Sequence, residues 1–130
     1  MAEQPTVDEI LATVARFLRD TAVPQLAGHA GFHARVAANA IDLVRRELEL
    51  RPALDHEAHA RLTGLLGHDG PLDALDAELC ARIADDGIAI DDPALLDHLW
   101  RTTLGKLAVD QPGYASYRAA LTGRSMSAAP

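Results

Sequence analysis

The sequence predicts an all-α fold: a single compact bundle of five helices, or six if a short last segment is also helical. The chain has 130 residues and is rich in Ala and Leu, whereas aromatic residues make up 4% of it. This composition favours helix over strand. Apolar residues recur at spacings of three and four along several segments, which is the period of an α-helix. Gly and Pro separate these segments, and the length suits one domain.

The first predicted helix begins at a capping box. Thr6 and Glu9 stand three apart, so the hydroxyl and the carboxylate can each bond a free backbone N–H group of the first turn. Pro24 is expected to kink or end this helix, and Gly28 to close the segment. The helical stripe consists of Val7, Ile10, Leu11, Val14, Phe17 and Leu18.

The second predicted helix, from Phe32 to Leu50, is expected at the centre of the bundle. It contains neither Gly nor Pro, and Pro52 is expected to stop it. At about 100° per residue, its apolar side chains cover a wide arc, which indicates a helix packed by more than one neighbour. The arc holds Phe32, Val36, Ala40, Ile41, Leu43, Val44, Leu48 and Leu50. An Asp at position 36 or 43 is therefore expected to unfold the protein.

Three or four further helices are expected. A third runs from Asp55 to Leu66, and a fourth starts at Pro71 with a narrow apolar stripe. A fifth starts at Asp92 and Pro93, a cap followed by a first-turn proline, and ends near Asp110. A last short helix covers 114–121. The expected buried residues of the fifth helix are Leu95, Leu96, Leu99, Trp100, Leu104 and Leu107. Residues 1–5 are then a short N-terminal tail, 6–122 the helical domain and 123–130 a disordered C-terminal tail.

Charge and composition exclude some classes of function. The formal net charge of −7 argues against nucleic-acid binding, which depends on Lys and Arg neutralising phosphates. No apolar run approaches the ~20 residues needed to span a membrane. The polar N-terminus lacks the pattern of a signal peptide, and the single cysteine, Cys80, suits a reducing compartment. We therefore expect a cytoplasmic protein without membrane or nucleic-acid partners.

Several polar residues interrupt or border the apolar faces. On the second helix, His33 falls inside the apolar arc, while Arg35, Asn39 and Arg46 line its edge. They are either boundary residues paired with neighbouring helices or part of a surface that contacts a ligand or partner. Lys106 and Asp110 stand four apart on the fifth helix and are more simply explained as a structural pair.

Catalytic and metal-binding patterns are weak. The His29 and His33 pair lacks the further ligands of a zinc site, and Cys80 is typical of a small apolar residue beside Leu79. There is no Gly-x-Ser-x-Gly elbow and no phosphate-binding glycine loop. We expect no cofactor, no metal and no self-sufficient active site.

Two strings carry a family resemblance. FHARVAANA at 32–40, followed by VRREL at 44–48, and KLAVDQPGY at 106–114, with Tyr117, resemble the motifs of a bacterial family of small all-helical proteins of unknown function. Members of that family are typically encoded beside an aminoglycoside-phosphotransferase-like kinase and an acyl-CoA dehydrogenase. The resemblance implies an accessory role in the phosphorylation of hydroxyacyl-CoA thioesters. It adds weight to a partner or ligand surface that comprises His33, Arg35, Asn39, Arg46, Lys106, Asp110, Tyr114 and Tyr117.

Three functions remain open from the sequence. The first is a non-catalytic subunit that binds a phosphotransferase-like kinase, with the acyl-CoA dehydrogenase or a second copy of the chain as further candidate partners. The second is a domain that binds acyl-CoA or another anionic ligand, with Arg35 or Arg46 meeting its phosphates. The third is an enzyme with His33 as general base, which has the least support because no residue in the sequence pattern orients that side chain.

Overall fold

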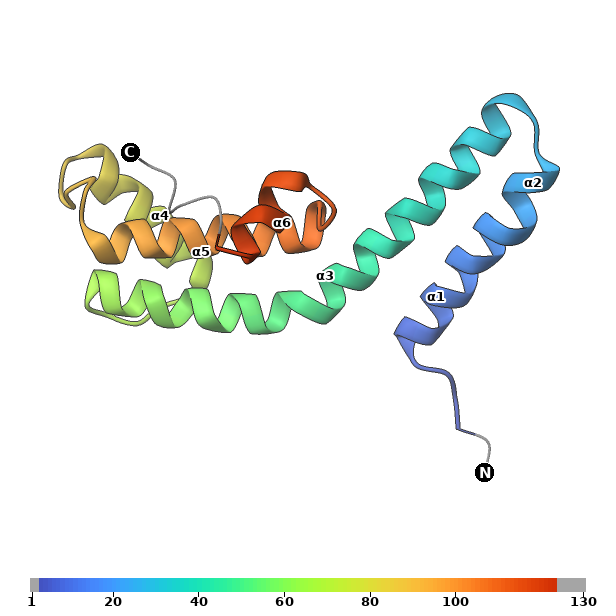
Figure 1. Ribbon diagram of the computed structural model, residues 1–130. Coiled ribbons are helices and arrows are strands. Elements are labelled where there is room, and N and C mark those ends of the chain that lie inside the picture. The colour runs from blue at the N-terminus through green and yellow to red at the C-terminus, as the bar shows by residue number, and fades with distance from the viewer. Residues whose placement is uncertain (1–2, 124–130) are drawn as a thin grey trace. The chain divides into compact units, whose positions relative to one another are not determined.

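The computed structural model describes residues 3–123, and these are helical apart from short turns (Figure 1). The all-α prediction is confirmed. Most of the tail predicted at 123–130 lies outside the described residues. The elements in chain order are α1 (Val7–Phe17), the π-helix η1 (Leu18–Ala22), α2 (Val23–Gln25), α3 (Gly28–Leu66), α4 (Leu72–Ala84), α5 (Pro93–Asp110) and α6 (Ala115–Leu121).

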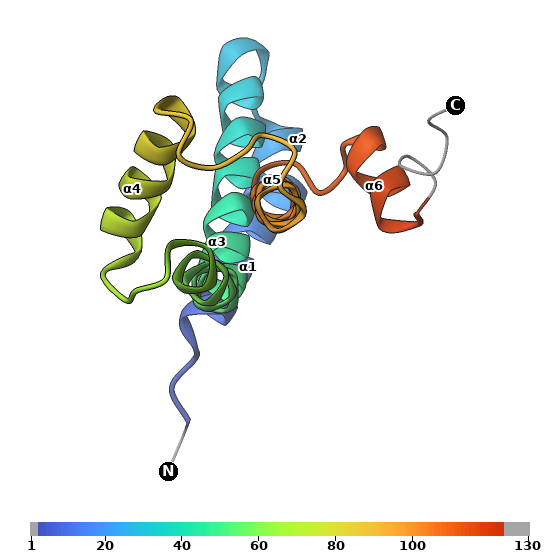
Figure 2. The ribbon, with the colours of Figure 1, turned by 90° about the vertical axis from the view of Figure 1, so that its left-hand side faces the viewer.

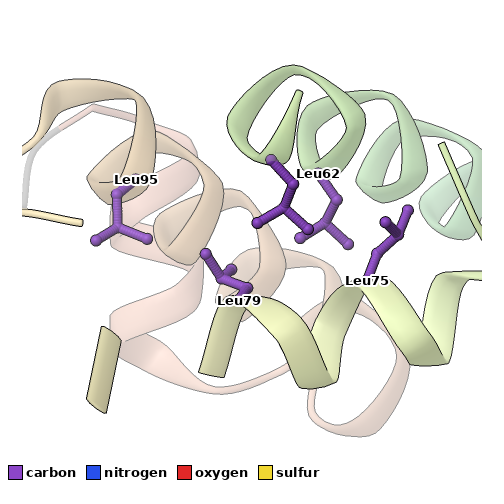
Figure 3. Close-up of a cluster of buried hydrophobic side chains, with 5 residues drawn as sticks. Leu62, Leu75, Leu79 and Leu95 are labelled. Atoms are coloured by element: carbon purple, nitrogen blue, oxygen red, sulfur yellow. The ribbon is translucent and has the colours of Figure 1, made fainter. Parts of the chain in front are cut away.

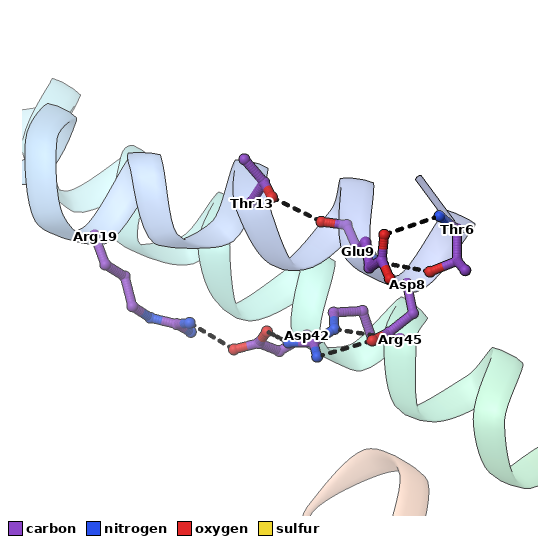
Figure 4. Close-up of polar contacts among 7 residues, drawn as sticks. All are labelled: Thr6, Asp8, Glu9, Thr13, Arg19, Asp42 and Arg45. Carbon is purple, nitrogen blue, oxygen red and sulfur yellow. Dashed lines mark hydrogen bonds and ion pairs between the residues drawn. The ribbon is translucent and has the colours of Figure 1, made fainter. Parts of the chain in front are cut away.

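The start of α1 is the capping box that the sequence predicts. The Glu9 N–H donates to the Thr6 hydroxyl oxygen at 3.1 Å, and the Thr6 N–H donates to the Glu9 carboxylate at 3.2 Å (Figure 4). Two N–H groups that would have no partner inside the helix are therefore satisfied.

The helical run that starts at α1 ends close to Pro24, as predicted. The chain first widens into η1, where the Val23 N–H reaches back to the Leu18 carbonyl, and it leaves helical geometry at Leu26. Gly28 then takes a positive φ of 61°, which favours glycine. Gly31 is needed for a different reason, because a Cβ there would lie 2.8 Å from the carbonyl oxygen of Leu26.

The prediction that Pro52 separates two helices is wrong. Helix α3 runs through it, from Gly28 to Leu66. Proline removes the hydrogen bond that residue 52 would donate to the Leu48 carbonyl. The flanking residues, among them Glu49, Leu50, Ala53 and Leu54, are good helix formers, so the helix resumes after this one defect.

The chain divides into two compact units, an N-terminal unit (Met1–Glu49) and a C-terminal unit (Leu50–Pro130). The division falls within α3, just before Pro52. The predicted single domain over 6–122 stays a prediction, and each unit is described by itself below.

The N-terminal unit is a hairpin of α1 and η1 against the first half of α3. Its buried apolar residues are Ala15 of α1 with Ala34 and Ala38 of α3. Small side chains allow two helices to approach closely, but they remove little apolar area from water. The core of this unit is therefore thin.

The long second helix is confirmed as part of α3, but its apolar arc is not buried as predicted. Phe32, Val36, Leu43, Val44 and Leu48 are all exposed. The side of α3 that meets α1 is the neighbouring stripe of small residues around Ala34 and Ala38. The apolar arc predicted from the sequence exists, but the described residues leave much of it uncovered.

The C-terminal unit has a true leucine core. Leu62 and Leu66 of α3 pack against Leu75 and Leu79 of α4 and Leu95 of α5 (Figure 3). Figure 2 looks along α5 and shows α4 to one side of it and α6 to the other. The narrow stripe predicted for the fourth helix is confirmed by Leu75 and Leu79.

The fifth helix begins at the predicted cap, where the Leu95 N–H donates to the Asp92 carboxylate at 3.0 Å. Its predicted buried arc is only partly correct. Leu95 is buried, whereas Leu96, Leu99 and Trp100 are exposed. The periodicity identifies the apolar residues of a helix, but not how many neighbours cover them.

Candidate functional site

The first candidate site is an exposed apolar surface on the N-terminal unit, which we call the apolar hairpin face. Each of its nine large side chains is between 38% and 63% exposed. Scattered exposed apolar residues are common, whereas a concentration of them is a candidate interaction surface. The face consists of Val7, Ile10, Val14 and Phe17 of α1 with Phe32, Val36, Leu43, Val44 and Leu48 of α3.

The two helices contribute to this face from adjoining sides. At about 100° per residue, the exposed stripe of α1 is centred about a third of a turn from Ala15, which faces α3. Val44 and Leu48 lie a similar rotation from Ala38, on the same side of the hairpin, while Val36 and Leu43 point away from α1. Val7 and Leu48 line one surface depression of about 390 Å³, so the two stripes meet there.

Polar pairs hold the two helical segments of the hairpin together (Figure 4). Arg19 pairs with Asp42 at 2.6 Å, and Arg45 pairs with Asp8 at 2.9 Å. The hydrogen bond from Arg45, opposed by some desolvation, leaves the pKa of the Asp8 carboxyl below its usual value. The hairpin therefore combines paired polar groups that join its two helical segments with uncovered apolar groups on its surface, and the two kinds meet at the depression lined by Val7, Asp8, Arg45 and Leu48.

Four residues predicted as a functional surface lie on α3 in this unit. The Asn39 side-chain oxygen accepts a hydrogen bond from Arg19 at 2.7 Å, so Asn39 is one of the polar residues that join the two helical segments of the hairpin. Arg35 lines a shallow depression with Arg19 and Asn39. His33 is exposed, with its ring edge-on to Phe32, and Arg46 is half-buried.

The other four predicted residues lie in the C-terminal unit. Lys106 and Asp110 are both exposed, and no ion pair joins them, so the structural pair that we expected on α5 is not formed. Tyr114 precedes α6 and is half-exposed, and Tyr117 lies within α6. These eight residues therefore divide equally between the two units.

The second candidate site is a cavity of about 290 Å³ in the C-terminal unit, between α3, α4 and α5. Gly105 permits close packing at its wall, because a Cβ there would lie 3.0 Å from Leu54 of α3. Cys80, which the sequence places beside Leu79 as a small apolar residue, is exposed and lines the cavity. Lys106 lines it as well.

A polar group sits at the wall of this cavity. The Arg61 Nε–H donates to Nδ1 of His98 at 3.0 Å, and His98 is only 3% exposed. Burial, and next the positive charge of Arg61, lower the pKa of His98, which keeps the ring neutral and able to accept this bond. The Thr102 hydroxyl oxygen, one helical turn further along α5, is buried and has no hydrogen-bond partner.

Comparison with known families assigns the chain. A family model described as a domain of unknown function (DUF6285) matches residues 24–114. The chain belongs to this family. The match takes in both strings that carry the resemblance, whereas α1 of the DUF6285 chain lies before it. No curated protein and no solved structure matches the chain.

The described residues offer neither a metal site nor a membrane span. Among residues 3–123 of this DUF6285 protein, no three His, Cys, Asp or Glu side chains are grouped so that they could hold a metal ion. No helix in the same range has the length and apolar character needed to cross a membrane.

The sequence reasoning missed the cavity. His98, Thr102 and Lys106 recur every four residues on α5, and such a polar stripe within an apolar helix was the available signal. The contribution of Arg61 comes from a helix 37 positions away, and no local pattern indicates it.

Proposed function

We propose that this DUF6285 protein is a non-catalytic accessory subunit that binds a phosphotransferase-like kinase through the apolar hairpin face. The observation that carries the proposal is the exposure of nine large apolar side chains on a unit whose fully buried apolar side chains are all alanines. A helix with such a wide apolar arc requires more than one neighbour, and α1 provides one.

The energetics of the face support binding to another protein. Burying a Val, Leu, Ile or Phe side chain fully contributes about 1.5–3 kcal/mol, so covering nine half-exposed ones would contribute on the order of 10 kcal/mol. Part of that is lost to the ordering of the two partners. What remains is compatible with a stable complex, in which the apolar centre would be surrounded by the polar groups of the hairpin.

The identity of the partner rests on the family resemblance. It implies a phosphotransferase-like kinase that acts on hydroxyacyl-CoA, with an acyl-CoA dehydrogenase encoded nearby. In this proposal the kinase supplies the nucleotide site and the chemistry, and the DUF6285 chain stabilises or activates it.

Co-purification tests the proposal. The kinase is co-expressed with the wild-type chain, with Val14→Asp or Val36→Asp, and with Ala81→Asp, which places the same charge on an exposed site of α4. Wild type and Ala81→Asp should retain the kinase, whereas both changes on the face should lose it while the chain remains folded. Equal recovery of the kinase with all four proteins would exclude the face as the docking surface.

A second copy of the chain is the competing occupant of the face. Light scattering on the purified wild-type chain distinguishes the two cases. A monomer that forms a complex only with the kinase supports the proposal, whereas a dimer that is broken by Val36→Asp and does not bind the kinase assigns the face to self-association.

Binding of an anionic ligand by Arg35 or Arg46 has less support. The depression at Arg35 is shallow, and its neighbour Arg19 is already paired with Asp42.

A further inference from the structure

We propose that the cavity of the C-terminal unit binds a small molecule through an anionic group, a phosphate or a carboxylate, held by Arg61, Thr102 and Lys106. This inference concerns a different unit from the docking face and does not depend on the kinase.

The first argument is the local charge. Four cationic side chains line the cavity, Arg51, Arg61, Arg101 and Lys106, against the two carboxylates Asp55 and Asp76. The lining therefore has a formal charge of +2 (four minus two) in a chain whose net charge is −7. A cationic cavity in an acidic protein attracts anions selectively, because the low-dielectric walls concentrate its field.

The second argument is that two of these cations have no carboxylate partner. Arg51 lies 3.8 Å from Asp55, and Arg101 pairs with Asp97 at 3.0 Å. In contrast, no ion pair to a carboxylate within residues 3–123 involves Arg61 or Lys106. Arg61 is half-buried, and its one hydrogen bond goes to the neutral ring of His98. A half-buried guanidinium of this kind is suited to a bidentate contact with phosphate or carboxylate.

The third argument is the unsatisfied hydroxyl of Thr102. Its buried oxygen has no hydrogen-bond partner, although nearly all buried polar atoms in folded proteins have one. Thr102 lies four residues from both His98 and Lys106, so all three side chains project from one side of α5. A ligand oxygen that displaces the groups now covering this hydroxyl would accept from it and from Arg61.

The size of the cavity limits the ligand. A volume of about 290 Å³ is close to the lower end of small-molecule sites, about 300–1,000 Å³. It suits a small anion or the anionic end of a longer molecule. The apolar part of the wall, with Leu54 and Leu72, would contact the carbon atoms next to that group.

Nuclear magnetic resonance titration of the full chain tests the site, with inorganic phosphate and acetate as separate probes and chloride at matched ionic strength. We expect one or both probes to shift the signals of His98 and Thr102 saturably, and chloride to leave them unchanged. Phosphate alone or acetate alone identifies the preferred group. If no probe shifts these signals before the protein precipitates, the proposal is wrong.

Variants separate a ligand site from a structural cluster. Lys106→Gln should weaken binding of the effective probe by about tenfold, for the loss of about 1.4 kcal/mol, whereas Arg118→Gln on α6 should not change it. Thr102→Val keeps the shape of the side chain and removes the unpaired hydroxyl, so it should weaken binding and leave the melting temperature equal or higher. A Thr102→Val protein that binds normally, or is markedly destabilised, would contradict the assignment. Since Thr102→Val should not affect recovery of the kinase, failure here and failure of the docking proposal are distinguishable.

Discussion

The two units of this protein use apolar residues in opposite ways. The C-terminal unit buries leucines from three helices, Leu62, Leu75 and Leu95 among them, at 1% exposure or less. The N-terminal unit fully buries only Ala15, Ala34 and Ala38 among its apolar residues, and most of its large apolar side chains are exposed. Burial of large apolar side chains is the main favourable contribution to folding. The C-terminal unit therefore has the larger stabilising core, and in our proposal the N-terminal unit is completed by another protein.

The largest expected effect is in the leucine core. Leu62→Ala removes a side chain with no exposure and leaves a cavity, so it should lower the free energy of unfolding by about 2–5 kcal/mol. Val36→Ala, on the apolar hairpin face, should change it by about 0.5 kcal/mol or less. Urea denaturation of the two variants measures both values. Similar losses would mean that Val36 is covered within the free chain.

That comparison also replaces an expectation from the sequence. The periodicity predicts that Asp at position 36 or 43 unfolds the protein, because the arc is taken as core. With Val36 47% exposed and Leu43 38% exposed, we now expect both variants to fold and to lose the partner instead. Circular dichroism decides between the two expectations.

A smaller effect is expected from two glycines of α3. Gly31→Ala places a Cβ 2.8 Å from the Leu26 carbonyl oxygen, so it should destabilise the hairpin by about 1–3 kcal/mol. Gly64→Ala is the matched control, because its Cβ would meet nothing within 4 Å. Alanine in a helix interior should stabilise the C-terminal unit by about 0.5–1 kcal/mol. Thermal unfolding of both variants should give opposite signs, and a stabilising Gly31→Ala would show that the Leu26 loop is not held against α3.

Two histidines of the C-terminal unit should give pH dependences of opposite sign. Burial lowers the pKa of His98 below 6.5, so its contribution to stability is present above pH 6.5 and is lost as the pH falls toward the folded value. A hydrogen bond to the Asp69 backbone, and next Glu78, raise the pKa of His68, so its contribution is present below pH 6.5 and is lost as the pH rises through the folded value. Melting temperatures between pH 5 and 8 measure both effects. His98→Gln should lose the rise of stability with pH, and His68→Gln should lose the fall of stability with pH. If His98→Gln keeps the slope of the wild type, His98 is not buried in neutral form.

The smallest effect concerns the ion pair between Asp8 of α1 and Arg45 of α3. Asp8→Asn removes an exposed partner of Arg45 and should lower the melting temperature slightly at low salt and not at high salt, because exposed ion pairs are screened. If the melting temperature is lowered equally in high salt, the pair is not a screened surface ion pair.

Features that depend on nearby residues could be predicted from the sequence, whereas features that depend on contacts between different helices could not. The Thr6 capping box and the Asp92 cap depend on residues three positions apart, so the sequence contains all the information they need. Proline lowers the stability of a helix locally, so Pro52 predicts a helix end. The strong helix formers around it outweigh this penalty, and α3 continues. Burial of the α3 arc depends on what packs against it, and the cavity depends on Arg61 and His98 from different helices. Neither relation can be read from one segment.

Hydrogen exchange tests most directly whether the N-terminal unit is completed by a partner. The backbone amides of 7–17 and 28–49 should exchange quickly in the free chain and much more slowly in the complex with the kinase, while those of 62–79 should be slow in both. Exchange in 7–17 and 28–49 that is equally slow with and without the kinase, or protection gained only in the C-terminal unit, would contradict the account.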